Sequence, residues 1–336
     1  MRYARALAVM LLATLVGSAL TGCGGRQDTA PAQNASGGCE APADTTITIA
    51  TGNAGGVYDV LGTRLAELLT QATENKVRAS ATQTGASVQN IQDLAEGRHQ
   101  VAFAVADAAA DAVNGVGAFR GRPQRIAALG RLYPNYTQVV ARADTGINSV
   151  VELRGRRVST GSPGSGTELV AERVLAAAGL DPARDVKVRR LDLAASVDGM
   201  RSGSVDALFF SGGLPTPGIT TLFTGLRGKV KLLDTAPQLA ALHRSSAAYQ
   251  VATIPGATYP GAANTQAIVV PNLLLVAADM DAGLACALTR ALYQHTAELA
   301  AANPAAREIK QANARRTEPV PLHPGARRAL DMLGTR

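Results

Sequence analysis

The chain has 336 residues, of which 46% are hydrophobic, 4% aromatic and 18% charged, and its formal net charge at pH 7 is +7. This apolar content excludes a disordered chain, and the length predicts about two domains of roughly 150 residues each. The basic residues stand singly or in pairs without interleaved aromatics, so the charge does not indicate nucleic-acid binding and we expect no nucleic acid partner.

The N-terminal segment predicts export. Residues 1–22 combine two Arg, an apolar stretch over residues 6–16 and a small-residue end, and the sequence LTGC brings Cys23 directly after them. This pattern is typical of a bacterial lipoprotein signal peptide, which is cleaved before the Cys receives lipid chains such as palmitate. Cleavage would remove Arg2 and Arg5 and leave a net charge of +5. An uncleaved anchor, or a chance LTGC, is the alternative interpretation.

Residues 23–43 predict a flexible tether, because Gly, Ala, Pro, Ser and Gln dominate them and cannot bury enough apolar surface to fold. We therefore expect an extracytoplasmic protein that is lipid-anchored to the outer face of the cell membrane. If Cys23 is acylated, Cys39 and Cys286 are the remaining cysteines. Outside the cell these two are candidates for a disulfide, and two unpaired thiols are the alternative.

Strands alternate with helices in the first half of the folded region. A strand over residues 46–51 passes through the glycine-rich loop GNAGG into a helix over 57–70. A second strand over 77–82 passes through the loop QTGAS into a helix that begins near Val88. A third, short strand is expected over 101–105. This alternation is typical of parallel βα units.

The same pattern continues in the second half. A long extended segment over 126–141 is expected to break at Tyr133-Pro134. A strand over 153–160 enters the loop GSPGSGTE and a helix that stops at Gly179, and a buried strand over 205–210 leads into Ser-Gly-Gly. Loops of this kind let backbone N–H groups and the positive ends of helices approach an anion.

Signatures of catalysis and metal binding are missing from the sequence. The histidines His99, His243, His295 and His323 are far apart, and the motifs HExxH, CxxC and GxSxG do not occur. We therefore expect no metal, no cofactor and no enzyme. A triad assembled in space from Ser165, His243 and an Asp would instead make the protein an exported hydrolase, and this is the alternative.

Six segments of the chain occur in the order in which one known family has them. They are ITIATGNAGGVY, TQTGASVQNIQDLAEGRHQVAFAVAD, LRGRRVSTGSPGSGTE, SVDALFFSGGLPTP, TIPGATYPG and VVPNLLLVAAD. In these segments the chain resembles the TAXI-type extracytoplasmic solute receptors of TRAP transporters, whose fold is similar to that of type II periplasmic binding proteins. The resemblance spans most of residues 46–310.

The resemblance implies a two-lobed α/β fold, with a ligand cleft between lobes that are joined by crossover strands. Lobe 1 would comprise residues 44–136 plus 265–336, and lobe 2 would comprise residues 137–264. The implied function is the capture of a small carboxylate, glutamate or dicarboxylate-like, for an integral membrane TRAP permease subunit. An input protein for a membrane sensor kinase is the alternative. We expect a monomer.

The resemblance also implies ligand contacts in the loops that open the helices. The implied ligand-binding residues are Asn53, Gly56, Tyr58, Thr84, Ser87, Arg131, Tyr133, Ser162, Ser165, Gly166, Thr167, Phe210 and Ser211. Structural roles are the alternatives for several of them. The glycines can serve only the turn, Ser87 can be a helix N-cap, Phe210 can be a core residue and Ser211 a turn residue.

Three positions depart from the pattern of the family. Val105 stands where relatives often carry Gln, and Asn135 where they often carry Glu, which leaves the identity of the ligand open. Arg131 stands where relatives have small residues. Because strand residues two apart share a face, it would lie beside Tyr133 and could clamp a carboxylate, with a solvated or lobe-bridging Arg as the alternative. Asp107 is expected to cap the helix that follows it.

The C-terminal segment from residue 312 carries a Pro-interrupted link and then a short basic helix over residues 324–333. We expect this helix to pack on lobe 1. A basic face turned toward the membrane is the alternative.

Overall fold

The computed structural model of the protein describes residues 39–334. The predicted signal peptide, the acylation site Cys23 and the tether before Cys39 lie outside the described residues. The strands are β1 Thr45–Ala50, β2 Val77–Thr82, β3 Val101–Val105, β4 Ile126–Arg142, β5 Arg157–Ser159, β6 Lys187–Arg189, β7 Ala207–Gly212, β8 Val230–Leu233, β9 Gln250–Ile254 and β10 Thr265–Ala277. The helices are α1 Val57–Ala72, α2 Ser87–Ala95, α3 Ala106–Asn114, α4 Gly166–Ala177, α5 Leu193–Ser202, α6 Pro217–Gly225, α7 Leu239–Leu242, α8 Ala282–Gln294, α9 Thr296–Ala302 and α10 Pro324–Met332.

The ten strands of the described chain form one hydrogen-bonded sheet, in the order β2-β1-β3-β10-β4-β7-β5-β6, with β8 paired to β4 and β9 to β10. β1 pairs in parallel with β2 and β3, and β5 pairs in parallel with β6 and β7. Between these two groups, β10 is antiparallel to β3 and β4 is antiparallel to β7. The predicted parallel βα units are therefore confirmed in each half, and two long antiparallel strands join them.

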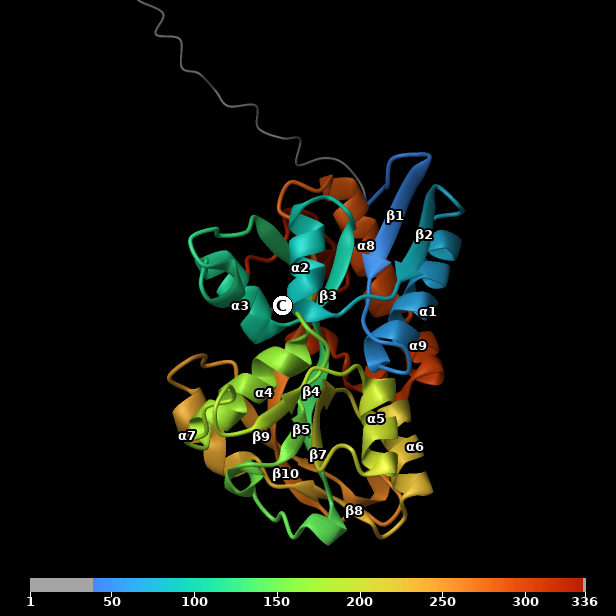
Figure 1. Cartoon of the computed structure of the whole chain (residues 1–336). Coiled ribbons are helices and arrows are strands. Elements are labelled where there is room, and N and C mark those ends of the chain that lie inside the picture. Colours follow the sequence, from blue (N-terminus) through green and yellow to red (C-terminus); the bar gives the residue numbers. More distant parts are fainter. Residues whose placement is uncertain (1–38, 335–336) are drawn as a thin grey trace, which may run out of the picture. The chain divides into compact units, whose positions relative to one another are not determined.

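Figure 1 shows β1, β2 and β3 in the upper half of the molecule and β5, β7, β8 and β9 in the lower half. We call the upper half lobe 1 and the lower half lobe 2. The strands β4 and β10 belong to both, since β4 pairs with β10 at one end and with β7 and β8 at the other. The predicted lobe boundaries fall inside β4 and at the start of β10.

The crossover strand β4 is continuous through Tyr133 and Pro134, which corrects the predicted break. Pro134 lies opposite Pro271 of β10. Neither proline has a backbone N–H. Because the two face each other, the hydrogen bonds missing from the ladder are confined to a single residue pair. Next to this pair the register shifts, because β4 has one residue more between Arg131 and Pro134 than β10 has between Leu273 and Pro271. This extra residue is a β-bulge, which interrupts the alternation of side chains along β4.

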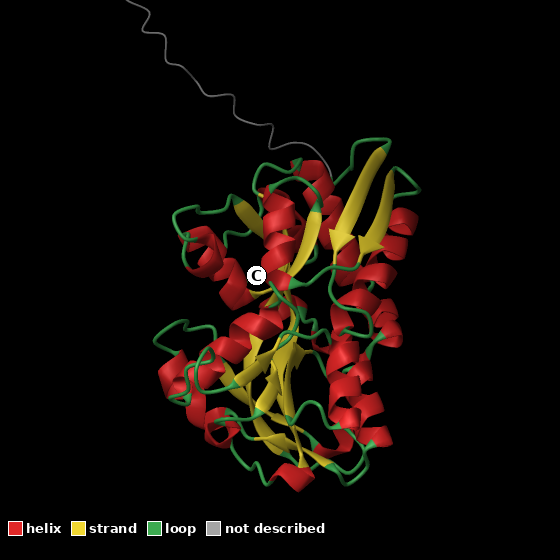
Figure 2. Cartoon of the chain, viewed as in Figure 1, coloured by secondary structure: helices red, strands yellow, loops and turns green. Residues whose placement is uncertain are grey.

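Helices cover both faces of the sheet in each half (Figure 2). In lobe 1, α1 buries Leu61, Leu65 and Leu68 at helical spacing in one cluster with Ile47 of β1. A second cluster lies in lobe 2 under α5 and α6. A third cluster contains Ile91 of α2, Ala108 of α3 and Val170 of α4. Because α2 and α3 belong to lobe 1 and α4 to lobe 2, the lobes share part of their apolar core.

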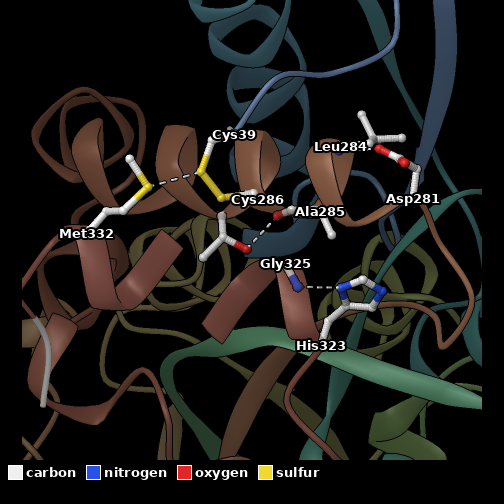
Figure 3. The surroundings of a disulfide bond; sticks show 9 residues. Cys39, Asp281, Leu284, Ala285, Cys286, His323, Gly325 and Met332 are labelled. Atoms are coloured by element: carbon white, nitrogen blue, oxygen red, sulfur yellow. Dashed lines mark hydrogen bonds between the residues drawn. A yellow bond between two sulfur atoms is a disulfide. The ribbon is translucent and has the colours of Figure 1, made fainter. Parts of the chain in front are cut away.

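A disulfide joins Cys39 to Cys286 of α8, with 5.0 Å between the two Cα atoms (Figure 3). The predicted pairing is therefore present in the structure. Met332 of α10 places its Sδ 3.4 Å from the Sγ of Cys39. The helix α10 packs closely on α8, since a Cβ on Gly325 would lie only 2.2 Å from the carbonyl oxygen of Ala282. The prediction that the C-terminal helix packs on lobe 1 is confirmed.

The predicted strand over residues 153–160 is shorter in the structure. Val150–Leu153 forms a 3₁₀ turn and β5 begins only at Arg157. The interruption coincides with Gly155, whose φ of +74° is incompatible with an extended strand. Among the helices of residues 39–334, none is both long and apolar enough to cross a membrane.

Candidate ligand-binding site

The first residues of α1, α2 and α4 lie around one cavity, together with the middle of β4 and the end of β7. α4 begins at Gly166, and the hydroxyl of its N-cap Ser165 accepts a hydrogen bond of 2.9 Å from the N–H of Glu168. A Cβ on Gly166 would lie 2.6 Å from the Oγ of Ser87 and 3.0 Å from a methyl of Val105. Glycine is therefore required for α4 to approach the start of α2 this closely.

The cavity has a volume of about 30 Å³ and walls from both lobes. It is lined by Gly52, Asn53, Gly56, Val57, Tyr58, Ala86, Ser87, Tyr133, Asn135, Ser165, Gly166, Thr167, Phe210, Ser211 and Gly212. The structure thus brings the sequence-predicted residues together, with the exception of Thr84, Arg131 and Ser162.

Two of the three exceptions take part in hydrogen bonds next to the cavity. Thr84 donates from its hydroxyl to Oδ1 of Asn90 at 2.5 Å and accepts from the N–H of Ala86 at 3.0 Å. Ser162 donates to Oδ1 of the cavity residue Asn53 at 3.0 Å. The bond from Ser162 therefore connects lobe 2 to lobe 1 directly.

Arg131 does not line the cavity and lies apart from the face of Tyr133. Its carbonyl accepts a 2.7 Å hydrogen bond from the hydroxyl of Tyr293. Burial lowers the pKa of the Arg131 guanidinium, and the charge of nearby Arg316 lowers it further. The structural reason is the bulge in β4, because the extra residue breaks the alternation that would have put Arg131 and Tyr133 on one face.

Three polar oxygens of the cavity wall are buried and have no hydrogen-bond partner within the described residues. They are Oη of Tyr133, Oδ1 of Asn135 and Oγ of Ser211. Leaving a buried polar atom without a partner costs about 1–3 kcal/mol, so unpaired groups are rare in folded proteins and each one needs a physical explanation. Burial raises the pKa of Tyr133, and the neighbouring Tyr58 raises it further, so the phenol is a neutral donor.

Asn272 of β10 supports this wall from behind and was not singled out from the sequence. Its Oδ1 accepts a 2.5 Å hydrogen bond from the hydroxyl of Tyr58, and its Nδ2 donates at 2.9 Å to the carbonyl of Tyr133. The only signal in the sequence is one Asn inside the apolar run VVPNLLLV. A fully buried amide in such a strand has to have partners, and here they are two residues of the cavity.

The N-terminus of α2 is occupied by the opposite lobe. The backbone N–H groups of Val88 and Gln89 donate to the carbonyl of Gly164, at 3.1 and 3.0 Å. Ser87 is the first residue of the helix and does not cap it through its side chain, which corrects that alternative. Its Oγ accepts instead from the N–H of Val105 at 3.2 Å. Among the three helices that begin at the cavity, α2 therefore uses the N–H groups of Val88 and Gln89 for a contact between the lobes.

A second contact between the lobes is a cluster of charged residues outside the cavity. Arg173 of α4 lies 2.7 Å from Oδ2 of Asp107 and 2.6 Å from Oδ2 of Asp111, both on α3. Tyr249 donates its hydroxyl to Oδ2 of Asp107. Burial raises the pKa of Asp107, whereas the charge of Arg173 lowers it. The prediction that Asp107 caps α3 is wrong, because it lies within the first turn and its carboxylate pairs across the lobes.

Comparison with known families and structures agrees with this architecture. Residues 49–332 match the model of the NMT1-like family. The chain belongs to the NMT1-like family. The finer assignment to the TAXI-type receptors stays a prediction.

Solved structures similar to this NMT1-like protein include three bacterial proteins. A protein of Bordetella bronchiseptica RB50 is 18% identical with a TM-score of 0.53, over 85% of this chain and 89% of that one. The binding-protein component of an ABC phosphonate transporter from Pseudomonas aeruginosa is 12% identical with a TM-score of 0.53, over 79% and 80%. The alkanesulfonate-binding protein SsuA from Xanthomonas axonopodis pv. citri, bound to MOPS, is 17% identical with a TM-score of 0.49, over 87% and 85%. The fold is that of the two-lobed periplasmic binding proteins, as the sequence predicted.

The hydrolase alternative finds no support in the geometry of this NMT1-like protein. Ser165 uses its hydroxyl to cap α4, and Nε2 of His243 lies 2.9 Å from the carbonyl of Tyr249. No hydrogen bond joins Ser165 to His243 in the described residues. Nor does the described part of the chain bring together three or more His, Cys, Asp or Glu side chains that could hold a metal ion.

A larger groove of about 1110 Å³ lies beside the charged cluster of the NMT1-like protein, between α4 and β6. Two of the cationic side chains on its wall are already paired, Arg173 with Asp107 and Asp111, and Arg190 with Glu168 at 2.6 Å. Among the described residues, three buried oxygens without partners, those of Tyr133, Asn135 and Ser211, line the smaller cavity, and none lines the groove. We therefore assign the candidate site to the smaller cavity.

Proposed function

We propose that this NMT1-like protein is an extracytoplasmic receptor that captures a small carboxylate in the cavity between its lobes. The observation that carries the proposal is the convergence of three buried oxygens without partners, from Tyr133, Asn135 and Ser211, on one cavity wall. A solute that supplies their hydrogen bonds would recover about 1–3 kcal/mol at each group.

The chemistry of the wall favours an anionic group on the solute. Tyr133 and Ser211 are hydroxyl donors, and the starts of α1 and α4 point their N-terminal ends at the same cavity. Each helix end carries a fractional positive charge that stabilises an anion by about 0.3–1 kcal/mol, and up to about 2 kcal/mol where the site is partly buried. A carboxylate matches this set of donors because it accepts several hydrogen bonds.

Capture requires the lobes to separate. A cavity of about 30 Å³ does not admit a molecule the size of an amino acid. The lobes are connected through β4 and β10, and the other contacts between them include hydrogen bonds, the Arg173 cluster and the apolar cluster that α4 shares with α2 and α3. Two-lobed proteins of this kind close around ligands by hinge motion.

The proposed receptor hands its solute to an integral membrane TRAP permease subunit and acts as a monomer. Support for a transport role comes from the fold, which it shares with the binding-protein component of a phosphonate transporter. Support for the site of action comes from the lipoprotein pattern ending at Cys23 and the tether that follows it. A lipid anchor would hold the receptor within reach of a permease in the same membrane.

The proposal is tested by thermal denaturation of the purified protein with glutamate, glutamine, 2-oxoglutarate and succinate. A bound solute stabilises the folded state by RT ln(1 + [L]/Kd), which is about 2.7 kcal/mol at a hundredfold excess over Kd. We expect at least one of these carboxylates to raise the melting temperature. If none of the four raises the melting temperature at concentrations up to about 10 mM, the carboxylate claim is contradicted. This concentration exceeds a millimolar Kd, which corresponds to a standard binding free energy of about 4 kcal/mol in magnitude.

A further inference from the structure

We infer that the solute carries a single carboxylate, and that the group it places at Asn135 is neutral, an amide or a hydroxyl. The inference rests on the proposed function and narrows its solute class. It departs from the dicarboxylate that the sequence led us to expect.

The first observation is the chemistry of the wall. Within the described chain, the residues lining the cavity include no Lys, Arg, His, Asp or Glu. Their polar groups are hydroxyls, amides and backbone. A buried carboxylate without a cation is costly, and two of them in one small cavity would also repel each other. The helix ends of α1 and α4 offer fractional charges, which suit one carboxylate and leave a second uncompensated.

The second observation is that neither Arg131 nor Arg173 is placed to supply a cation to the cavity by moving its side chain alone. Arg131, the guanidinium expected from the sequence at this place, lies near Arg316 and away from the cavity. Arg173 is committed to Asp107 and Asp111. Neither Arg131 nor Arg173 is therefore placed to balance a second anionic group at the cavity.

The third observation concerns Asn135. Asn135 is 2% exposed, and its Oδ1 accepts no hydrogen bond within the described residues. An amide side chain has a carbonyl acceptor and an NH₂ donor, so it complements another amide or a hydroxyl completely. A carboxylate is only an acceptor, and would leave the Oδ1 acceptor of Asn135 without a donor. Asn135 therefore selects a neutral group with a hydrogen to donate.

The experiment is calorimetric titration of the purified protein with two matched pairs, glutamine against glutamate and succinamate against succinate. Within each pair only one carboxylate is exchanged for an amide of nearly the same shape. We expect the amide member of at least one pair to bind ten or more times more tightly than its dicarboxylate. Equal or tighter binding of both dicarboxylates overturns the inference and leaves the receptor function standing. No binding of any of the four contradicts both.

A variant tests whether Asn135 sets the preference for the amide over the dicarboxylate. In Asn135→Leu the ratio of glutamine to glutamate affinity should fall toward one, because the group that distinguishes the amide is gone. Gln238→Leu is the matched control, since Gln238 is also a buried amide with a partnerless Oε1 and does not line the cavity. The control should keep the wild-type ratio. An unchanged ratio in Asn135→Leu would show that Asn135 does not set the preference. The wild-type titration decides the solute class even if one variant does not fold.

Discussion

Arg173 of α4 reaches from lobe 2 to Asp107 of α3 in lobe 1, with 2.7 Å between Nη1 and Oδ2. Asp107 is fully buried, and Asp111 and Tyr249 complete the contact. None of these four residues lines the candidate site. The pair therefore stabilises the closed arrangement of the lobes from outside the cavity, and it can change affinity for the solute without touching it.

This relationship predicts that Asp111→Asn weakens solute binding. The variant keeps the shape of the side chain and removes one charged partner of Arg173, and hydrogen bonds to charged groups contribute about 1.5–3 kcal/mol. We expect the dissociation constant to rise by about tenfold or more and the radius of gyration of the unliganded protein in small-angle scattering to increase. Asp144→Asn is the control, because Asp144 is exposed and pairs with Arg142 within one lobe. Unchanged affinity and radius in Asp111→Asn would show that the cluster does not hold the lobes together.

The close approach of α4 to α2 predicts that Gly166→Ala impairs closure. The added methyl would lie 2.6 Å from Oγ of Ser87, a distance that real Cβ atoms do not adopt. The lobes can relieve this contact by moving apart, so we expect weaker solute binding with little loss of thermal stability. The double variant Gly166→Ala with Ser87→Gly removes the obstacle and should regain part of the affinity. Wild-type affinity in Gly166→Ala would contradict the closed geometry at this point.

The disulfide between Cys39 and Cys286 predicts a stability difference on reduction. It closes a loop with a sequence separation of 247 residues, and native disulfides typically contribute about 2–4 kcal/mol. We expect Cys286→Ala to lower the free energy of unfolding by that amount in urea denaturation, with solute affinity unchanged. Thiol labelling before and after reduction provides the direct check. Two free thiols in the oxidised protein would contradict the bond.

His323 predicts a pH dependence of stability. Burial lowers the pKa of its imidazole, and Nδ1 accepts a 3.1 Å hydrogen bond from the N–H of Gly325. In the unfolded chain a His titrates near pH 6.5. The unfolded state therefore takes up a proton first as the pH falls below about 6.5, and the free energy of unfolding decreases there. His323→Asn keeps a capping acceptor without titrating, so denaturation at pH 7.5 and 5.0 should show a smaller loss for the variant. Equal losses would contradict this role of His323.

Much of the fold follows from local sequence patterns, and what does not follow depends on contacts distant in sequence. The strands β2 and β3 match their predicted ranges, and α1 follows the spacing of its buried leucines. The continuity of β4 was not predictable, because it depends on Pro271 lying opposite Pro134. The short strands β6, β8 and β9 and the helices α5 and α6 gave too little periodic signal to be predicted.

The candidate site, too, was predictable where it depends on local sequence and not where it depends on contacts distant in sequence. Glycine and hydroxyl loops at helix starts identified most of the cavity wall, because the start of each helix is a local feature. The position of Arg131 was wrong because a bulge changed the face of one strand residue. The role of Asp107 was misjudged because it depends on Arg173, and Asn272 was missed because its role depends on Tyr58. Both partners are remote in sequence.

The most direct test of the account compares affinity and stability after removal of the hydroxyls without partners. Tyr133→Phe and Ser211→Ala delete oxygens that have no partner in the described structure, so the free energy of unfolding should stay the same or rise, while binding of the best carboxylate should weaken by about 1–3 kcal/mol. Tyr293→Phe is the opposite control, since its hydroxyl donates to the carbonyl of Arg131 away from the cavity and its loss should reduce stability but not affinity. Calorimetric titration and denaturation of all three decide the matter. Loss of stability with unchanged affinity in Tyr133→Phe and Ser211→Ala would contradict the assignment of the cavity as the solute site.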